Sequence, residues 1–180
     1  LGGSGEIEAR SVVVATGVEP RMPEIAGISH PKVVSYADLL DGKVVAGRRV
    51  AVVGAGGIGV DVAHFLTHDH TETTEDWLAH WGVGDPSLHP GGLTAPKSRE
   101  PVREVTLVQR KTSMIGKGLG KTSGWAHRAV LKQAGVEQVS GATYDRIDDA
   151  RLHLTLDRVP PGLAGHPGVV CAGPGAGRDL

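Results

Sequence analysis

Three glycines at the first, third and sixth positions of one short motif are the residues best suited to chemistry. Gly54, Gly56 and Gly59 follow a β-branched run and open a segment with helical apolar spacing. The first permits a tight turn, the second lets the backbone approach a pyrophosphate, and the third allows close packing of helix on strand. A helix that begins here also offers free N–H groups to phosphates. The motif predicts a phosphate cradle, with a purely structural glycine turn as the alternative. Its expected binding residues are Gly54, Ala55, Gly56, Gly57, Ile58 and Gly59.

A pair of cations indicates which nucleotide would bind. An acid about 20 residues after the glycines would bind the ribose 2′-hydroxyl of NAD(H). Glu75 and Asp76 stand near that distance, but they fall in a polar insertion and not at the end of a strand. The second strand is expected to end at Gln109, directly before Arg110 and Lys111. These three residues are predicted to bind the adenosine ribose, and the two cations favour NADP(H) over NAD(H), with a solvated basic strand end as the alternative.

Other chemically suggestive groups are weaker signals. His64 and His68 have the spacing of metal ligands on one helix face, with His70 close by, but a convincing third ligand is lacking. We therefore expect surface imidazoles, no metal site and no catalytic side chain in this chain. Further cations either extend a cationic rim around the phosphates or are solvated: Lys117, Lys121 and Arg128.

Composition limits the class of protein. Hydrophobic residues make up 39% of the chain and the net charge is −1, which favours neither nucleic acid nor an anionic membrane as a partner. No apolar run approaches the roughly 20 residues that span a bilayer. Cys171 is the single cysteine, so this chain alone cannot form a disulphide or hold an iron–sulphur cluster. We expect a cytoplasmic protein whose sequence is truncated at both ends.

The hydrophobic pattern predicts the elements that position these residues. Alternating strands and helices, followed by a small antiparallel meander and one more strand, indicate a doubly wound, Rossmann-like α/β domain that binds NAD(P). Residues 68–103 are a polar insertion with a short helix near 76–81. Buried strands are expected at 10–15, 105–109, 136–140 and 169–172, antiparallel strands at 143–147 and 152–156, and helices at 35–40, after the glycines to about 67, and at 125–134.

Several motifs resemble the bacterial NADPH-dependent 2,4-dienoyl-CoA reductases, within the old-yellow-enzyme-like NADH:flavin oxidoreductases. The resemblance covers nearly the whole chain, and its most specific part runs from residue 116 to 128. The motifs lie at residues 12–17, 19–23, 28–31, 35–39, 54–63, 107–111, 118–128 and 170–173.

The resemblance implies which parts of the chain belong to which cofactor-binding domain. Residues 46–160 would form the NADP(H)-binding domain, with 1–45 and 161–180 as the outgoing and returning segments of an FAD domain. Segments approaching FAD would be Ala15, Thr16, Gly17 and Ala172, Gly173. The partners would be the nicotinamide dinucleotide and the missing FAD and FMN-barrel domains of the same polypeptide. In that family hydride passes from NADPH to FAD, and electrons then pass through a 4Fe-4S cluster to FMN, which reduces the dienoyl-CoA in fatty-acid β-oxidation.

One departure keeps alternatives open. The family usually continues its last motif with Gln-Glu-Pro, whereas this chain has Pro174, Gly175 and Ala176. This departure would fit a degenerate fragment without nucleotide, and a non-catalytic ADP-binding module of a related flavoprotein is a second alternative. The paired cations argue against a bare ADP site, because ADP carries no 2′-phosphate.

Overall fold

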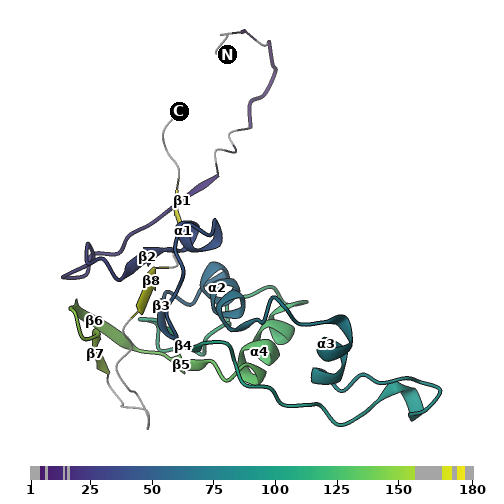
Figure 1. Cartoon of the computed structure of the whole chain (residues 1–180). Helices are drawn as coiled ribbons and strands as arrows, with labels where there is room; N and C mark the ends of the chain where they lie inside the picture. The colour runs from purple at the N-terminus through teal and green to yellow at the C-terminus, as the bar shows by residue number, and fades with distance from the viewer. Residues whose placement is uncertain are drawn as a thin grey trace.

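A five-stranded parallel sheet organises the molecule, in the order β2-β8-β3-β4-β5 (Figure 1). The computed structural model describes residues 5, 6, 8–13, 15, 17–156, 168–171 and 174–176. The chain runs outward from β3 to β5 and returns to β8 on the other side of β3, so the strand order reverses between β3 and β8. This arrangement confirms the doubly wound α/β fold. The strands are β2 (Val33–Ser35), β3 (Arg49–Val53), β4 (Glu104–Val108), β5 (Glu137–Val139) and β8 (Gly168–Cys171).

Helices cover one face of this sheet and a hairpin covers the other. Successive side chains of a strand point to opposite faces. Val50 and Val52 accordingly pack with Leu66 of α2 (Gly57–Thr67) and with α4 (Gly124–Gln133), whereas Ala51 and Val53 pack with the hairpin of β6 (Ala142–Ile147) and β7 (Leu152–Leu156). β3 is thus buried on both faces, and its apolar run reflects this.

Short-range signals in the sequence account for several element ends. The Ser35 hydroxyl accepts a hydrogen bond from the Asp38 backbone N–H at 3.1 Å and donates to its carboxylate at 2.8 Å, which starts α1 (Tyr36–Leu40). Gly135, with φ of +66°, follows the end of α4. The predicted helices at 35–40 and 125–134 and the predicted antiparallel pair are confirmed, within one residue or two at each end.

Two segments that flank the sheet run beside each other. β1 (Val18–Pro20) pairs antiparallel with β9 (Pro174–Ala176). The predicted FAD-domain segments, 1–45 and 161–180, also contain β2 and β8. Both of these strands belong to the same sheet as β3. The division of the chain into domains stays a prediction.

The buried strand expected at residues 10–15 is wrong. Residues 10–13 and 15 lie outside any strand. The side chains of Val12 and Val13 are 78% and 88% exposed. A strand buried on both faces needs neighbouring strands and covering layers. The described part of this chain supplies neither around these residues.

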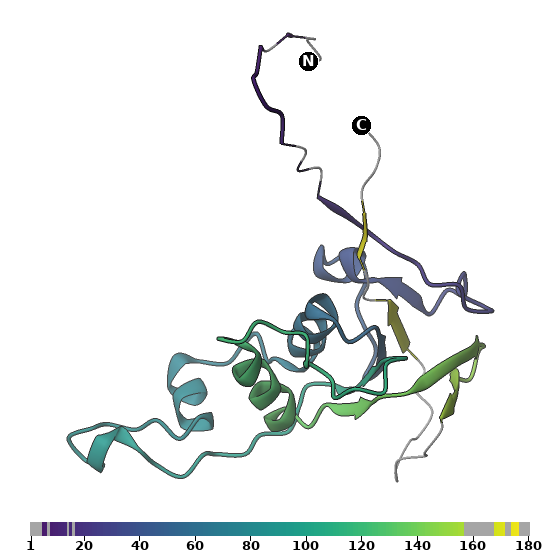
Figure 2. The same cartoon turned by 180° about the vertical axis from the view of Figure 1, so that it is seen from behind.

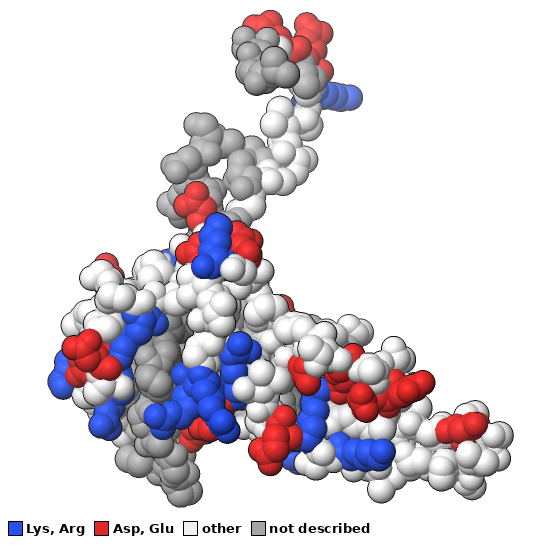
Figure 3. All heavy atoms as spheres, in the orientation of Figure 1, with Lys and Arg blue, Asp and Glu red and all other residues white. Residues whose placement is uncertain are grey.

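The insertion forms an arm that projects from one side of the sheet (Figures 1 and 2). It contains α3 (Thr74–His80) and the 3-10 turn η1 (Pro90–Gly92). The two ends of the arm are joined by an ion pair at 2.5 Å between Glu72 and Arg99, and the Glu72 side chain is only 6% exposed. Figure 3 shows acidic side chains along this arm with basic ones between them, whereas several basic side chains lie close together over the body of the sheet. None of the helices in the described residues is long and apolar enough to cross a membrane.

Candidate nucleotide-binding site

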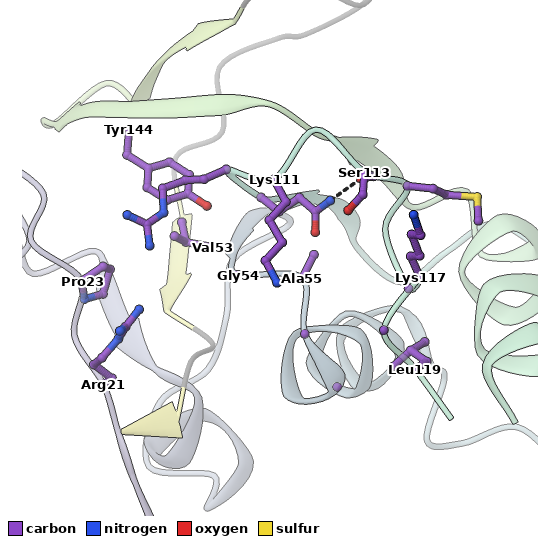
Figure 4. Close-up of a pocket in the computed structure, with 17 residues that line it drawn as sticks. Arg21, Pro23, Val53, Gly54, Ala55, Lys111, Ser113, Lys117, Leu119 and Tyr144 are labelled. Carbon is purple, nitrogen blue, oxygen red and sulfur yellow. Dashed lines mark hydrogen bonds between the residues drawn. The ribbon is translucent and has the colours of Figure 1, made fainter. Parts of the chain in front are cut away.

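A cavity of about 570 Å³ lies at the carboxyl ends of β3 and β4 (Figure 4). Ligands of open α/β sheets bind outside the carboxyl ends of the strands, next to the point where the strand order reverses. The cavity occupies this position. It is lined by Arg21, Pro23, Val53, Gly54, Ala55, Gly56, Gly57, Gln109, Arg110, Lys111, Ser113, Met114, Gly116, Lys117, Gly118, Leu119 and Tyr144.

The floor of the cavity is the glycine turn between β3 and α2. Gly54 has a φ of +108°, a conformation that side chains disfavour, and its N–H donates to the Val108 carbonyl at 2.9 Å. A Cβ on Gly59 would stand 1.8 Å from the Gly54 carbonyl oxygen, so the helix crosses the turn only because that residue has no side chain. The fold itself therefore requires these two glycines.

Gly56 and Gly57 differ from the other glycines of the motif. A Cβ on either would meet no atom within 4 Å, although both residues line the cavity. Gly56 is the N-cap of α2 and provides no side-chain cap, and no acidic residue stands in the first turn. The first N–H groups of a helix have no partner within the helix. The open space and the uncapped donors fit a phosphate group.

Cations line this cavity from several sides. Arg110 and Lys111 directly follow β4, and in Figure 4 the Lys111 side chain extends from the end of the strand toward Gly54 and Ala55. Lys117 and Arg21 add two further cations, whereas none of the lining residues is Asp or Glu. The cavity therefore has the charge of an anion-binding site.

Gln109 holds the start of this cationic loop. Its side-chain amide donates to the Ser113 carbonyl at 2.5 Å (Figure 4) and lies 3.3 Å from the Ser140 hydroxyl. The residue is only 9% exposed. With its amide committed to the loop, Gln109 positions Arg110 and Lys111 as well as lining the cavity.

Not every residue predicted to bind a cofactor lines the cavity. Ile58 packs against the core under α2, and Gly59 packs against the turn. Ala15 and Gly17, predicted to approach FAD, are exposed and do not line this cavity. The other three predicted FAD contacts lie outside the described residues: Thr16, Ala172 and Gly173.

The cavity also includes residues for which the sequence predicted no binding role. Arg21 and Pro23 come from the connector after β1, and Tyr144 comes from β6, where its hydroxyl donates to the Val108 carbonyl at 3.3 Å. Pairings between distant segments bring them here, and no local signal marks them. Lys121 and Arg128 do not line the cavity, although the Arg128 guanidinium donates to the carbonyl of the lining residue Gly116 at 3.2 Å.

The histidines near the end of α2 form a separate cluster. The His64 and His68 rings lie 5.9 Å apart, and the His68 and His70 rings 5.0 Å apart. Partial burial, together with neighbouring His68 and His127, lowers the pKa of His64. Within the described residues, no group of three or more His, Cys, Asp or Glu side chains is arranged to hold a metal ion.

Known proteins match long stretches of this chain. The mercuric reductase of Lysinibacillus sphaericus is 22% identical, over 84% of this chain and 22% of that protein. The nitric oxide reductase FlRd-NAD(+) reductase of Aeromonas hydrophila subsp. hydrophila is 30% identical, over 67% of this chain and 30% of that protein. The chain thus spans less than a third of the length of either relative.

A solved structure and a family model complete the comparison. The structure of a 2-naphthoyl-CoA reductase shares the fold with a TM-score of 0.61 and 21% identity, over 89% of this chain and 19% of that one. The model described as pyridine nucleotide-disulphide oxidoreductase matches residues 2–162, most of the sequence. The chain therefore belongs to the pyridine nucleotide-disulphide oxidoreductase family.

Proposed function

We propose that the cavity binds NADP(H), with the pyrophosphate on the glycine turn and the adenosine 2′-phosphate beside Arg110 and Lys111. The observation that carries this proposal is that both cations line the same cavity as Gly54–Gly57, with no carboxylate among the lining residues. A 2′-phosphate adds a charge of about −1.5 to −2 near neutral pH. An acidic residue that pairs with the 2′-hydroxyl would repel that charge, whereas two cations attract it.

Other elements of the chain would complete the nucleotide site and connect it to a neighbouring domain. The N–H groups at the start of α2 would donate to the pyrophosphate, and Gln109 would keep the cationic loop in place. Bound NADPH supplies a hydride, for which the proposed acceptor is FAD in a neighbouring domain. The antiparallel pair of β1 and β9 supports such a neighbour, because it brings the segments that enter and leave the sheet together. We propose that the dinucleotide-binding unit extends beyond residues 46–160 to include β2 and β8, since both pair in its sheet.

Calorimetric titration of the 180-residue chain with 2′-phospho-ADP-ribose and with ADP-ribose tests the nucleotide assignment. We expect the 2′-phosphorylated ligand to bind at least about tenfold more tightly, since hydrogen bonds to a charged group contribute roughly 1.5–3 kcal/mol. Arg110→Ala should remove most of this preference. Arg48→Ala is the matched control, because Arg48 precedes β3 at the opposite edge of the sheet and its side chain is 86% exposed.

The same titration distinguishes the alternatives. Equal affinities for the two ligands, unchanged by Arg110→Ala, would indicate a plain ADP-binding module. Binding of neither ligand would indicate a domain that has lost its nucleotide.

For the complete enzyme, we propose a 2,4-dienoyl-CoA as the final acceptor. This finer assignment is supported by the sequence motifs, above all those from residue 116 to 128. Its test is NADPH oxidation by the whole polypeptide with a 2,4-dienoyl-CoA, against a saturated acyl-CoA as the control. Oxidation that is independent of the dienoyl-CoA would overturn the assignment and leave the proposed NADP(H) site unaffected.

A further inference from the structure

One cation of the cavity comes from a part of the chain remote from the glycine turn. Arg21 follows β1, and in Figure 4 its side chain points into the cavity from the side opposite Lys117. Ion pairs within the described part of the chain do not include Arg21, whereas Arg48 pairs with Glu104 and Arg99 with Glu72. Arg21 is thus a lining cation without a carboxylate partner among the described residues.

Strand pairing determines on which side of the glycine turn Arg21 lies. Val53, at the end of β3, pairs with Cys171, at the end of β8. β9 begins three residues later, and its first residue, Pro174, pairs with Pro20, the neighbour of Arg21. This chain of pairings puts Arg21 on the β8 side of β3, whereas Arg110 follows β4 on the other side.

The two sides correspond to the two halves of a dinucleotide. A dinucleotide lies across the crevice where the strand order reverses, which in this sheet is between β3 and β8. With the adenosine 2′-phosphate beside Arg110, the nicotinamide half extends toward β8. We infer that Arg21 binds the phosphate on the nicotinamide side of the pyrophosphate, an inference that rests on the proposed NADP(H) site. A guanidinium suits this role, because its planar donors pair with two phosphate oxygens at once.

Two ligands that differ in the nicotinamide half test this assignment on the 180-residue chain. NADP⁺ carries both phosphates of the pyrophosphate, whereas adenosine 2′,5′-bisphosphate keeps the 2′-phosphate and lacks the nicotinamide-side phosphate. We expect Arg21→Ala to weaken NADP⁺ binding about tenfold and to change binding of the bisphosphate less than about twofold. Arg21→Lys should recover part of the loss, because a lysine restores the charge without the paired geometry.

Two further variants calibrate the result. Arg110→Ala should weaken both ligands, because both carry the 2′-phosphate, and Arg48→Ala should weaken neither. An unchanged NADP⁺ affinity in Arg21→Ala would overturn the inference, and so would an equal loss for both ligands. In either case the effect of Arg110→Ala would show separately whether the proposed NADP(H) site stands. Failure of the unaltered chain to bind either ligand would overturn both.

Discussion

Gly59 lies directly against Gly54: a Cβ on residue 59 would stand 1.8 Å from the carbonyl oxygen of Gly54 and 2.9 Å from its carbonyl carbon. The atoms in the way belong to the backbone, so no side-chain rotation would relieve the clash. The relationship between these two residues fixes how α2 leaves β3. Gly54 and Gly59 are thus required by the fold, whereas Gly56 and Gly57 face open space.

Gly59→Ala is therefore expected to destabilise the folded chain. The added methyl would force α2 away from the turn and from the β4 core, and overpacking of this kind costs about 1–3 kcal/mol or more. Urea unfolding followed by circular dichroism measures the loss. Gly47→Ala, at an exposed loop position where a Cβ meets nothing, is the control. Equal stability of the Gly59 variant and the unaltered chain would contradict the tight crossing.

Gly56→Ala is expected to behave in the opposite way. Its Cβ would meet no atom of the protein within 4 Å, and Gly56 has a φ of −78°, which alanine adopts readily. The fold should survive with a loss below about 1 kcal/mol, the range for a changed N-cap residue. NADP⁺ affinity should fall at least about tenfold, because the methyl would occupy the space proposed for the pyrophosphate. Full NADP⁺ affinity in a folded Gly56 variant would argue against that placement.

Gln109→Glu tests the positioning of the cationic loop. The new carboxylate would face the Ser113 carbonyl, where the amide now donates, and would bring negative charge into the cavity. An unpaired buried acceptor costs roughly 1–3 kcal/mol, so both the melting temperature and NADP⁺ affinity should decrease. Gln138→Glu adds the same charge at an exposed position of β5. If both variants lose affinity equally, net charge alone explains the effect.

The β6–β7 turn gives a prediction for pH. The backbone N–H of Arg151, then His153 and the N–H of Ala150, hold the pKa of Asp148 well below its usual range. A carboxyl group whose pKa is lowered in the folded state stabilises it above the unfolded pKa of about 4, and this stabilisation is lost as the pH falls further. Asp148→Asn should therefore melt below the unaltered chain at pH 7, with a difference that narrows progressively below about pH 4.

Thermal unfolding of both proteins between pH 7 and pH 3 measures this difference. Glu24→Gln removes an exposed carboxylate from the connector and serves as the control. A difference between the Asp148 variant and the unaltered chain that is constant over this range would contradict the role of Asp148.

Local sequence patterns predicted the elements whose causes are local. The apolar run before Gly54 and the helical spacing after it predict β3 and α2, which the structure confirms. The short helix expected near residues 76–81 begins earlier, at Thr74, because the Thr73 hydroxyl accepts the Asp76 N–H and caps it. Boundaries of this kind depend on which of several polar residues forms the cap.

Features that depend on distant segments could not be predicted in the same way. The apolar residues Val12 and Val13 have the composition of a buried strand, but no described residue covers them. Arg21 reaches the cavity only through the pairing of β1 with β9, which no spacing in the sequence encodes. The position of Arg110 and Lys111 could be predicted without a local motif. Parallel strands end at the same edge of the sheet, so residues that follow β4 lie beside the glycine turn that follows β3. Their predicted contact with the nucleotide remains for experiment.

The arm between α2 and β4 has a consequence for how such a domain diversifies. The Arg103 guanidinium donates to the Leu66 carbonyl at 3.3 Å, and the backbone N–H of Glu104 donates to the Arg48 carbonyl at 2.9 Å, so the arm rejoins the body where β3 and β4 begin. The cavity lies at the other end of the same strands. Between these attachments the arm touches the body through α3, where the Gln133 side chain of α4 donates to the His80 carbonyl at 2.9 Å. Insertions or deletions in the arm that keep this contact are therefore expected to leave the ligand-facing edge of the sheet unchanged.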